Sequence, residues 1–166
     1  DLVLLRLLGG VLNRLIPHYQ PAAIIGEFRV YTARELDLTN EADHGETFAA
    51  HFHDLPAIVF PRMVRELSSA SVLTMEYLDG FKPGEPATFE LAAAARARVV
   101  KLGAQAILRM LYRDGFFHAD LHAGNLLILP GPAVRVGFVD LGMVGRFEDE
   151  TRRRLLYYYH ALVNGD

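Results

Sequence analysis

Three oxygen-bearing side chains lie close together in the second half of the sequence. Asp120 and Asn125 belong to one polar segment, and Asp140 follows after two apolar runs. A carboxylate and an amide oxygen are hard ligands that suit Mg²⁺, and a separate carboxylate can accept the proton of an attacking hydroxyl. We therefore expect Asn125 and Asp140 to hold a metal and Asp120 to act as the base in a phosphoryl transfer.

The spacing of these residues matches the protein-kinase pattern: H-x-D, then an Asn five residues after the Asp, then an Asp-x-Gly motif. His118 completes the first part, and Asp140-Leu141-Gly142 forms the last. We expect His118 to organise the loop through hydrogen bonds. Each motif alone is weak, whereas their shared order and spacing are specific. Turn formation and capping are the alternative roles for Asp120 and Asn125.

A transition-metal site is a second interpretation of the same segment. His118 and His122 are four residues apart, a spacing that binds zinc on a helix. Gly124 and the preceding Asp114-Gly115 pair indicate a loop instead, and the sequence contains no H-E-x-x-H motif. We therefore favour the magnesium site.

The elements that position these residues follow from apolar runs and turn residues. Thr88 is the expected N-cap of a long helix that ends at Gly115. The expected elements, in chain order, are one or two helices in residues 22–52, strands at 57–60 and 71–77, a linker at 81–86, a helix at 88–113, a loop at 116–125, a hairpin of 126–129 with 134–139, and an amphipathic helix at 148–163. This order predicts a two-part α+β domain.

Length and composition narrow the class of protein. The chain has 166 residues, which is the length of about one domain, and 51% of them are hydrophobic, enough for a real core. Its net charge of −3 gives no reason to expect nucleic acid as a partner. The absence of cysteine excludes disulfides and thiolate metal sites. Residues 2–16 are strongly apolar but short for a membrane span, so we expect a packed helix, with a membrane-surface helix as the alternative.

Several segments resemble the UbiB (AarF-domain) family of atypical kinases. Residues 116–125 are similar to the family's H-A-D-P-H-P-G-N loop, and residues 138–146 to its I-D-F-G-M-V-G-R segment. Residues 34–42 resemble its E-x-D motif with the adjacent E-A, and residues 72–80 its hinge. The chain departs from the family at three positions: Leu121 and Ala123 replace prolines, and Leu141 replaces a phenylalanine.

The resemblance implies a protein-kinase-like α+β fold. Residues 1–80 would form part of the N-lobe, with an αC-like helix and hinge strands, and residues 81–166 the catalytic core of the C-lobe. ATP and Mg²⁺ are the implied cofactors. Glu41 would pair with an ATP-binding lysine. The other implied nucleotide-site residues are the acidic pair Glu35 and Asp37 and the hinge residues Glu76, Tyr77 and Leu78.

The same family pattern carries a lysine and a nucleotide-covering loop upstream of Glu35. No lysine precedes Lys82. We therefore expect the chain to begin just after the strand that holds that lysine and to lack much of the nucleotide clamp.

The function implied by the resemblance is an ATP-dependent phosphotransferase or ATPase that supports isoprenoid-quinone (ubiquinone) biosynthesis. Its place would be the cytoplasmic face of a bacterial inner membrane, with quinone-biosynthesis enzymes and membrane lipid as partners besides the nucleotide. A small-molecule kinase of the aminoglycoside or choline type is one alternative, because Leu121-His122 fits its loop. The segment Met143–Arg146 favours UbiB. A nucleotide-binding regulatory scaffold without turnover is the other alternative.

Overall fold

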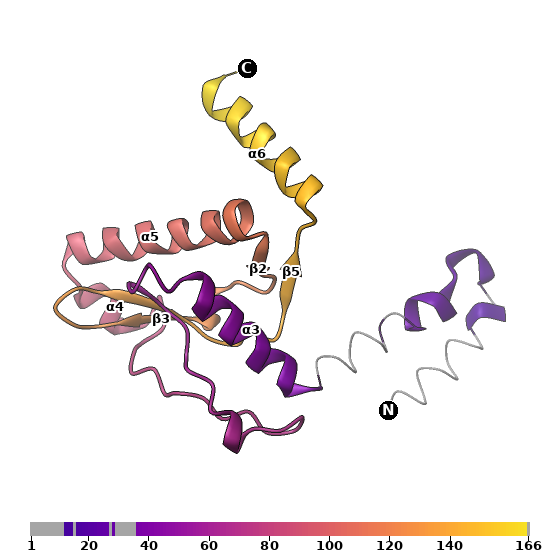
Figure 1. The fold of residues 1–166 in the computed structure, drawn as a ribbon, viewed down its shortest axis with the longest axis horizontal. Coiled ribbons are helices and arrows are strands. Elements are labelled where there is room, and N and C mark those ends of the chain that lie inside the picture. Colours follow the sequence, from indigo (N-terminus) through magenta and orange to yellow (C-terminus); the bar gives the residue numbers. More distant parts are fainter. Residues whose placement is uncertain (1–11, 15, 27, 29–35, 166) are drawn as a thin grey trace.

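The computed structural model describes residues 12–14, 16–26, 28 and 36–165, which form a mixed α+β structure (Figure 1). The predicted α+β class is therefore confirmed, while the division into lobes at residues 80 and 81 stays a prediction. The helices whose bounds lie within the described residues are η1 (Pro17–Tyr19), α3 (Leu38–His51), η2 (Arg65–Leu67), α4 (Pro86–Glu90), α5 (Ala93–Leu108), the π-helix η3 (Arg109–Asp114), η4 (Ala123–Asn125) and α6 (Asp149–Asn164). The strands are β1 (Ile58–Val59), β2 (Phe116–His118), β3 (Leu126–Leu129), β4 (Arg135–Phe138) and β5 (Val144–Arg146).

Helix α3 begins at a side-chain cap. Asp37 Oδ1 accepts a hydrogen bond from the Thr39 N–H at 3.1 Å, which satisfies one of the donors left open at the helix start. A new helix therefore begins at Leu38, which decides between the one or two helices predicted for residues 22–52. Ala42 and Phe48 are both fully buried on the inner face of this helix.

The hairpin predicted from two apolar runs is present. Strands β3 and β4 pair antiparallel, with Leu126 opposite Phe138, and β1 adds to the other side of β4 in parallel. A second, two-stranded sheet pairs β2 with β5. The predicted catalytic segment therefore runs from β2 to the start of β3, and Asp140 follows the end of β4.

The strand predicted at residues 71–77 is wrong. Only the isolated bridges Met63–Met75 and Ser69–Val72 form there. The Ser68 hydroxyl accepts from the Thr74 N–H at 3.0 Å, in place of a ladder partner. The turn η2 keeps the facing segment short, so no continuous ladder develops.

The single helix predicted from Thr88 to Arg113 is also wrong. Leu91 and Ala92 have extended backbone, with ψ angles of 139° and 148°, and they separate α4 from α5. The Thr88 hydroxyl does not cap a helix: it donates to the Lys82 carbonyl at 3.2 Å and accepts from the Gly84 N–H. The predicted end is correct, because Gly115 follows the π-helix in the left-handed conformation, with φ 62°.

An aromatic core joins α3 to both sheets. Phe48 stacks on Phe60 with ring centroids 5.1 Å apart, and Phe60 in turn packs on Phe138 at 5.4 Å. Phe48 also contacts Phe116 in β2 at 4.6 Å. Figure 1 shows α6 extending away from this core, and none of its described residues is buried. The core therefore connects the helix α3 directly to the strands that hold the candidate site.

Candidate active site

The predicted loop at residues 116–125 begins as a strand. β2 pairs with β5, and the Ala119 N–H extends the pairing by donating to the Met143 carbonyl at 2.9 Å. Gly145 makes the pairing possible, because a Cβ there would collide with the Phe117 ring. The strand β5, which follows Asp140, thus pairs with the strand β2, which leads to Asp120.

His118 connects the start of the loop to the end of the hairpin. Its Nδ1 accepts from the Asp120 N–H at 3.2 Å, so the proton lies on Nε2, which donates to the Val139 carbonyl at 3.4 Å. The ring is buried, and this burial lowers the pKa of His118, against the opposing effects of the Val139 carbonyl and the Asp140 and Asp120 charges. A neutral His118 therefore keeps both bonds, as expected of a loop organiser.

Asn125 is buried and its orientation is set by the loop itself. Its side-chain Nδ2 donates to the backbone carbonyl of Asp120 at 3.1 Å, and its backbone carbonyl accepts from the Val139 N–H at 3.0 Å. The first bond identifies Oδ1 as the atom that can bind a metal. Asp120 is thus held on both sides of its Cα, while its carboxylate is half exposed and lies 3.7 Å from His122 Nε2.

Asp140 has an unusual backbone. Its φ is 56°, in the left-handed region that few residues other than glycine adopt, and its side chain is exposed. Both neighbours are anchored: Val139 through Asn125 and His118, and Leu141 through α3. Anchored neighbours are what a strained conformation at a functional position requires.

Two predicted acidic residues, Glu41 within α3 and its N-cap Asp37, have different contacts. Glu41 Oε1 accepts from the Leu141 N–H at 3.0 Å, which brings this helix to the Asp140 motif. Asp37 bonds to Thr39 instead, and the side-chain and backbone hydrogen bonds from Thr39 lower the pKa of Asp37. Glu35 lies outside the described residues.

The predicted adenine-contacting segment runs beside β4. The Glu76 N–H donates to the Arg62 carbonyl at 2.8 Å, so this donor is already used. Leu78 packs over Gly137 in β4, where an added Cβ would lie 3.1 Å from Leu78 Cδ1. Tyr77 lies between them and is 85% exposed. The Glu76 N–H is therefore not available for the predicted backbone contact with adenine.

The donor set suits magnesium better than zinc. Within the described part of the chain, no three His, Cys, Asp or Glu side chains are grouped so that they could hold a metal. Both ring nitrogens of His118 are already engaged, which leaves the transition-metal interpretation without one of its two ligands. Asn125 and Asp140 offer hard oxygens, and Mg²⁺ takes the rest of its coordination from water and phosphate.

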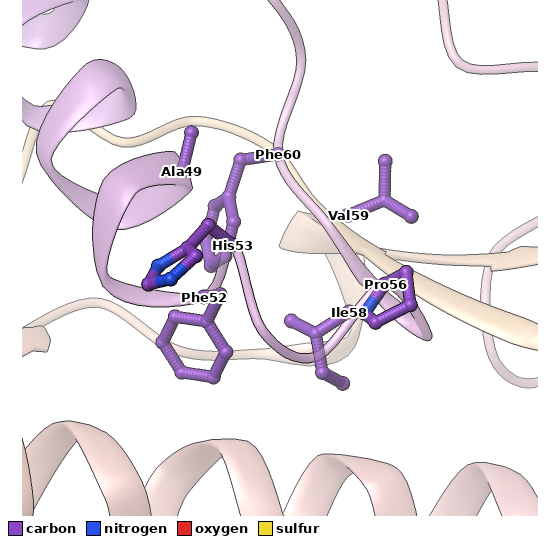
Figure 2. Close-up of a pocket in the computed structure, with 7 residues that line it drawn as sticks. All are labelled: Ala49, Phe52, His53, Pro56, Ile58, Val59 and Phe60. Atoms are coloured by element: carbon purple, nitrogen blue, oxygen red, sulfur yellow. The ribbon is translucent and has the colours of Figure 1, made fainter.

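A separate pocket of about 250 Å³ lies between the end of α3 and β1. Figure 2 shows Phe52 and His53 on one side and Pro56 and Ile58 on the other. Its described lining contains none of Asp120, Asn125 and Asp140, so we assign it no part in the chemistry.

Comparison with known proteins decides the family. The model of the ABC1 atypical kinase-like domain matches residues 1–166. The chain belongs to the ABC1 atypical kinase-like family. The resemblance to UbiB proteins is thereby confirmed.

Similar proteins occur in cyanobacteria, plants and mycobacteria. This ABC1 domain is 32% identical over 170 residues to the uncharacterised protein slr1919 of Synechocystis. The aligned region covers 100% of this chain and 30% of that protein. The domain is 32% identical over 168 residues to the chloroplastic protein ACTIVITY OF BC1 COMPLEX KINASE 3 of Arabidopsis thaliana, and covers 23% of it. A solved structure, the Rv3197–erythromycin complex from Mycobacterium tuberculosis, matches with a TM-score of 0.67 and 30% identity over 82% of this chain and 34% of the other. The domain thus spans less than a third of these two curated relatives.

Two further histidines lie close to the site: the sequence did not single out His44, and it singled out His122 only as a possible zinc ligand. His44 bonds to Leu141, and its only sequence signal is its place three residues after Glu41, on the same helical face. His122 Nδ1 accepts from the Gly124 N–H at 3.0 Å, which turns Nε2–H toward Asp120.

Among the described residues, no helix is both long enough and apolar enough to cross a bilayer.

Proposed function

We propose that this ABC1 domain supplies the proton acceptor and the metal ligands of an ATP-dependent phosphotransferase or ATPase. The observation that carries the proposal is the exposed Asp140 carboxylate, held on a left-handed backbone between two anchored neighbours. Together with Asn125 Oδ1 it forms the metal-binding pair. Bound Mg²⁺ would neutralise the phosphate oxygens during transfer.

Asp120 is the proposed proton acceptor. His118 holds its backbone N–H and the Asn125 amide holds its backbone carbonyl, so the position of the Asp120 backbone in the loop is defined. The side chain is 53% exposed, which leaves it accessible to an acceptor hydroxyl or a water. His122 Nε2–H faces the same carboxylate, 3.7 Å from Asp120 Oδ2.

The nucleotide would lie between the 76–78 segment and the Asp140 motif. We assign the adenine contacts to the backbone of Tyr77 and Leu78, with Glu76 beside them. Glu41 has two carboxylate oxygens, so its bond to Leu141 is compatible with an ion pair to an ATP-binding lysine. Asp37 and Glu35 remain proposed as the acidic motif near the nucleotide.

We extend the proposal to a role in isoprenoid-quinone biosynthesis at the cytoplasmic face of a bacterial inner membrane. The support is the resemblance of residues 116–125 and 138–146 to UbiB proteins, and the partners would be quinone-biosynthesis enzymes and membrane lipid. The test is the quinone content of cells that lack the gene. Complementation by the wild-type gene and not by the Asp140→Asn gene would support the role, and equal complementation would refute it.

Calorimetric titration of the complete protein with a non-hydrolysable ATP analogue tests the site itself. We expect binding that needs Mg²⁺ and that Asn125→Ala abolishes, because the variant removes a metal ligand. Asn164→Ala is the matched control, since Asn164 is exposed at the end of α6. Equal binding by Asn125→Ala would remove the basis of the proposal.

A further inference from the structure

Both backbone polar groups of Leu141 are held by side chains of α3. The Leu141 N–H donates to Glu41 Oε1 at 3.0 Å, and the Leu141 carbonyl accepts from His44 Nδ1 at the same distance. Glu41 and His44 are three residues apart, so they share a face of the helix. Because a carbonyl oxygen only accepts, the His44 ring carries a proton on Nδ1.

The close approach of Leu141 to α3 depends on the residue after His44. A Cβ on Gly45 would lie 3.3 Å from Leu141 Cδ1 and would collide with the end of Met63. Leu141 is 1% exposed, so its side chain is fixed in the core while its backbone is fixed by the helix. The peptide that follows Asp140 is therefore immobilised from both directions.

This arrangement gives His44 an effect on a residue that it does not touch. Asp140 sits between Val139 and Leu141 with φ 56°, a conformation that needs support from its neighbours. Val139 is held by Asn125 and His118, and Leu141 by Glu41 and His44. We propose that His44 is a positioning residue that fixes the backbone at Asp140 and thereby the direction of its metal-binding carboxylate.

His44 also contacts the strand that leads to the base. Its ring lies 5.9 Å from the Phe116 ring, at an interplanar angle of 60°. Phe116 begins β2, which ends at His118. His44 thus touches both the segment that carries the metal ligand and the segment that leads to Asp120, so it couples α3 to each.

The role of His44 rests on the proposed metal site. Two measurements on the complete protein distinguish a failure of the one from a failure of the other. Hydrogen exchange of residues 138–146 without nucleotide tests the hold on Leu141. Titration with Mn²⁺ and ATP tests the consequence for the metal. The variants are His44→Ala, which loses the bond, and His44→Asn, whose Nδ2 has the same reach as His Nδ1. His53→Ala is the control, because His53 Nδ1 donates to the Ala50 carbonyl at 2.8 Å in an exposed place away from Leu141.

In His44→Ala we expect exchange of this segment to rise and the affinity for Mn²⁺·ATP to fall, each by about fivefold, the effect of one lost hydrogen bond. We expect His44→Asn to restore both and His53→Ala to change neither. Unchanged exchange in His44→Ala would overturn the inference, and so would faster exchange with unchanged Mn²⁺·ATP affinity. A wild-type protein that exchanges slowly here but binds no Mn²⁺·ATP would instead overturn the proposed function, and with it the role of His44 toward the metal.

Discussion

The left-handed backbone at Asp140 predicts a conflict between stability and metal binding. Asp140 has φ 56°, and in the described structure its carboxylate forms no ion pair that a substitution would break. Asp140→Gly would remove a left-handed penalty of about 1–2 kcal/mol. It would also lose about 0.5–1 kcal/mol through the greater freedom of glycine in the unfolded chain. We therefore expect a net gain of about 0–1.5 kcal/mol in the free energy of unfolding.

Two further variants calibrate this value. Asp140→Asn should leave the free energy of unfolding nearly unchanged, because asparagine tolerates the left-handed region as aspartate does. Asp140→Ala should be about 1 kcal/mol less stable than Asp140→Gly, because its Cβ keeps the penalty. Metal binding should be lost in all three, since each removes the charged ligand.

The assay is equilibrium urea unfolding of the complete protein, first in EDTA and then with Mg²⁺ and a non-hydrolysable ATP analogue. At a ligand concentration 100 times the dissociation constant, the wild-type protein should gain about 2.7 kcal/mol. The three variants should gain nothing. If Asp140→Ala were as stable as Asp140→Gly in EDTA, the backbone argument would be refuted. If any variant kept the full gain, the metal assignment would be refuted.

Three other predictions concern stability. Phe48→Ala should cost about 3–5 kcal/mol in urea unfolding, because Phe48 is fully buried between Phe60 and Phe116; a loss below 1 kcal/mol would contradict the described core. Gly80→Ala should lower the melting temperature, since its Cβ would lie 2.7 Å from the Ile128 carbonyl oxygen, whereas Gly103→Ala, in open space on α5, should raise it. Burial lowers the pKa of His118, so as the pH falls below about 6.5 the unfolded state takes up a proton first and stability is lost. Unfolding followed from pH 7 to pH 5 should show a shallower loss in His118→Gln, and an equal loss would contradict this cause.

Much of the fold followed from local signals in the sequence. The apolar runs around the Pro130–Pro132 turn predicted the β3–β4 hairpin, and Gly115 predicted the end of the helical segment before β2. The break at Leu91 and Ala92 carries no such signal, because neither residue disfavours a helix. It is stabilised by a contact that spacing does not reveal: Arg96 donates to the carbonyls of Phe89 and Leu91.

The candidate site was predictable in its residue types but not in its support. The spacing of His118, Asp120, Asn125 and Asp140 predicted their shared location. The hydrogen bonds from α3 to Leu141 were not predictable, because they join residues about 100 positions apart. The positive φ of Asp140 was not predictable either, because its anchored neighbours depend on those distant contacts. Helical periodicity placed Glu41 on a helix and could not show which strand or loop its carboxylate would reach.

The most direct test of the phosphotransfer assignment is ATP turnover by the complete protein with Mg²⁺ and quinone-containing lipid vesicles, beside its Asp120→Asn variant. Asp120 is not a proposed metal ligand, so the variant should still bind Mg²⁺ and nucleotide. We predict that the wild-type protein consumes ATP and that Asp120→Asn does not, although both bind nucleotide equally. Equal turnover by the two proteins would contradict the assignment of the base. Nucleotide binding without turnover by either would contradict the enzymatic role and support a regulatory scaffold.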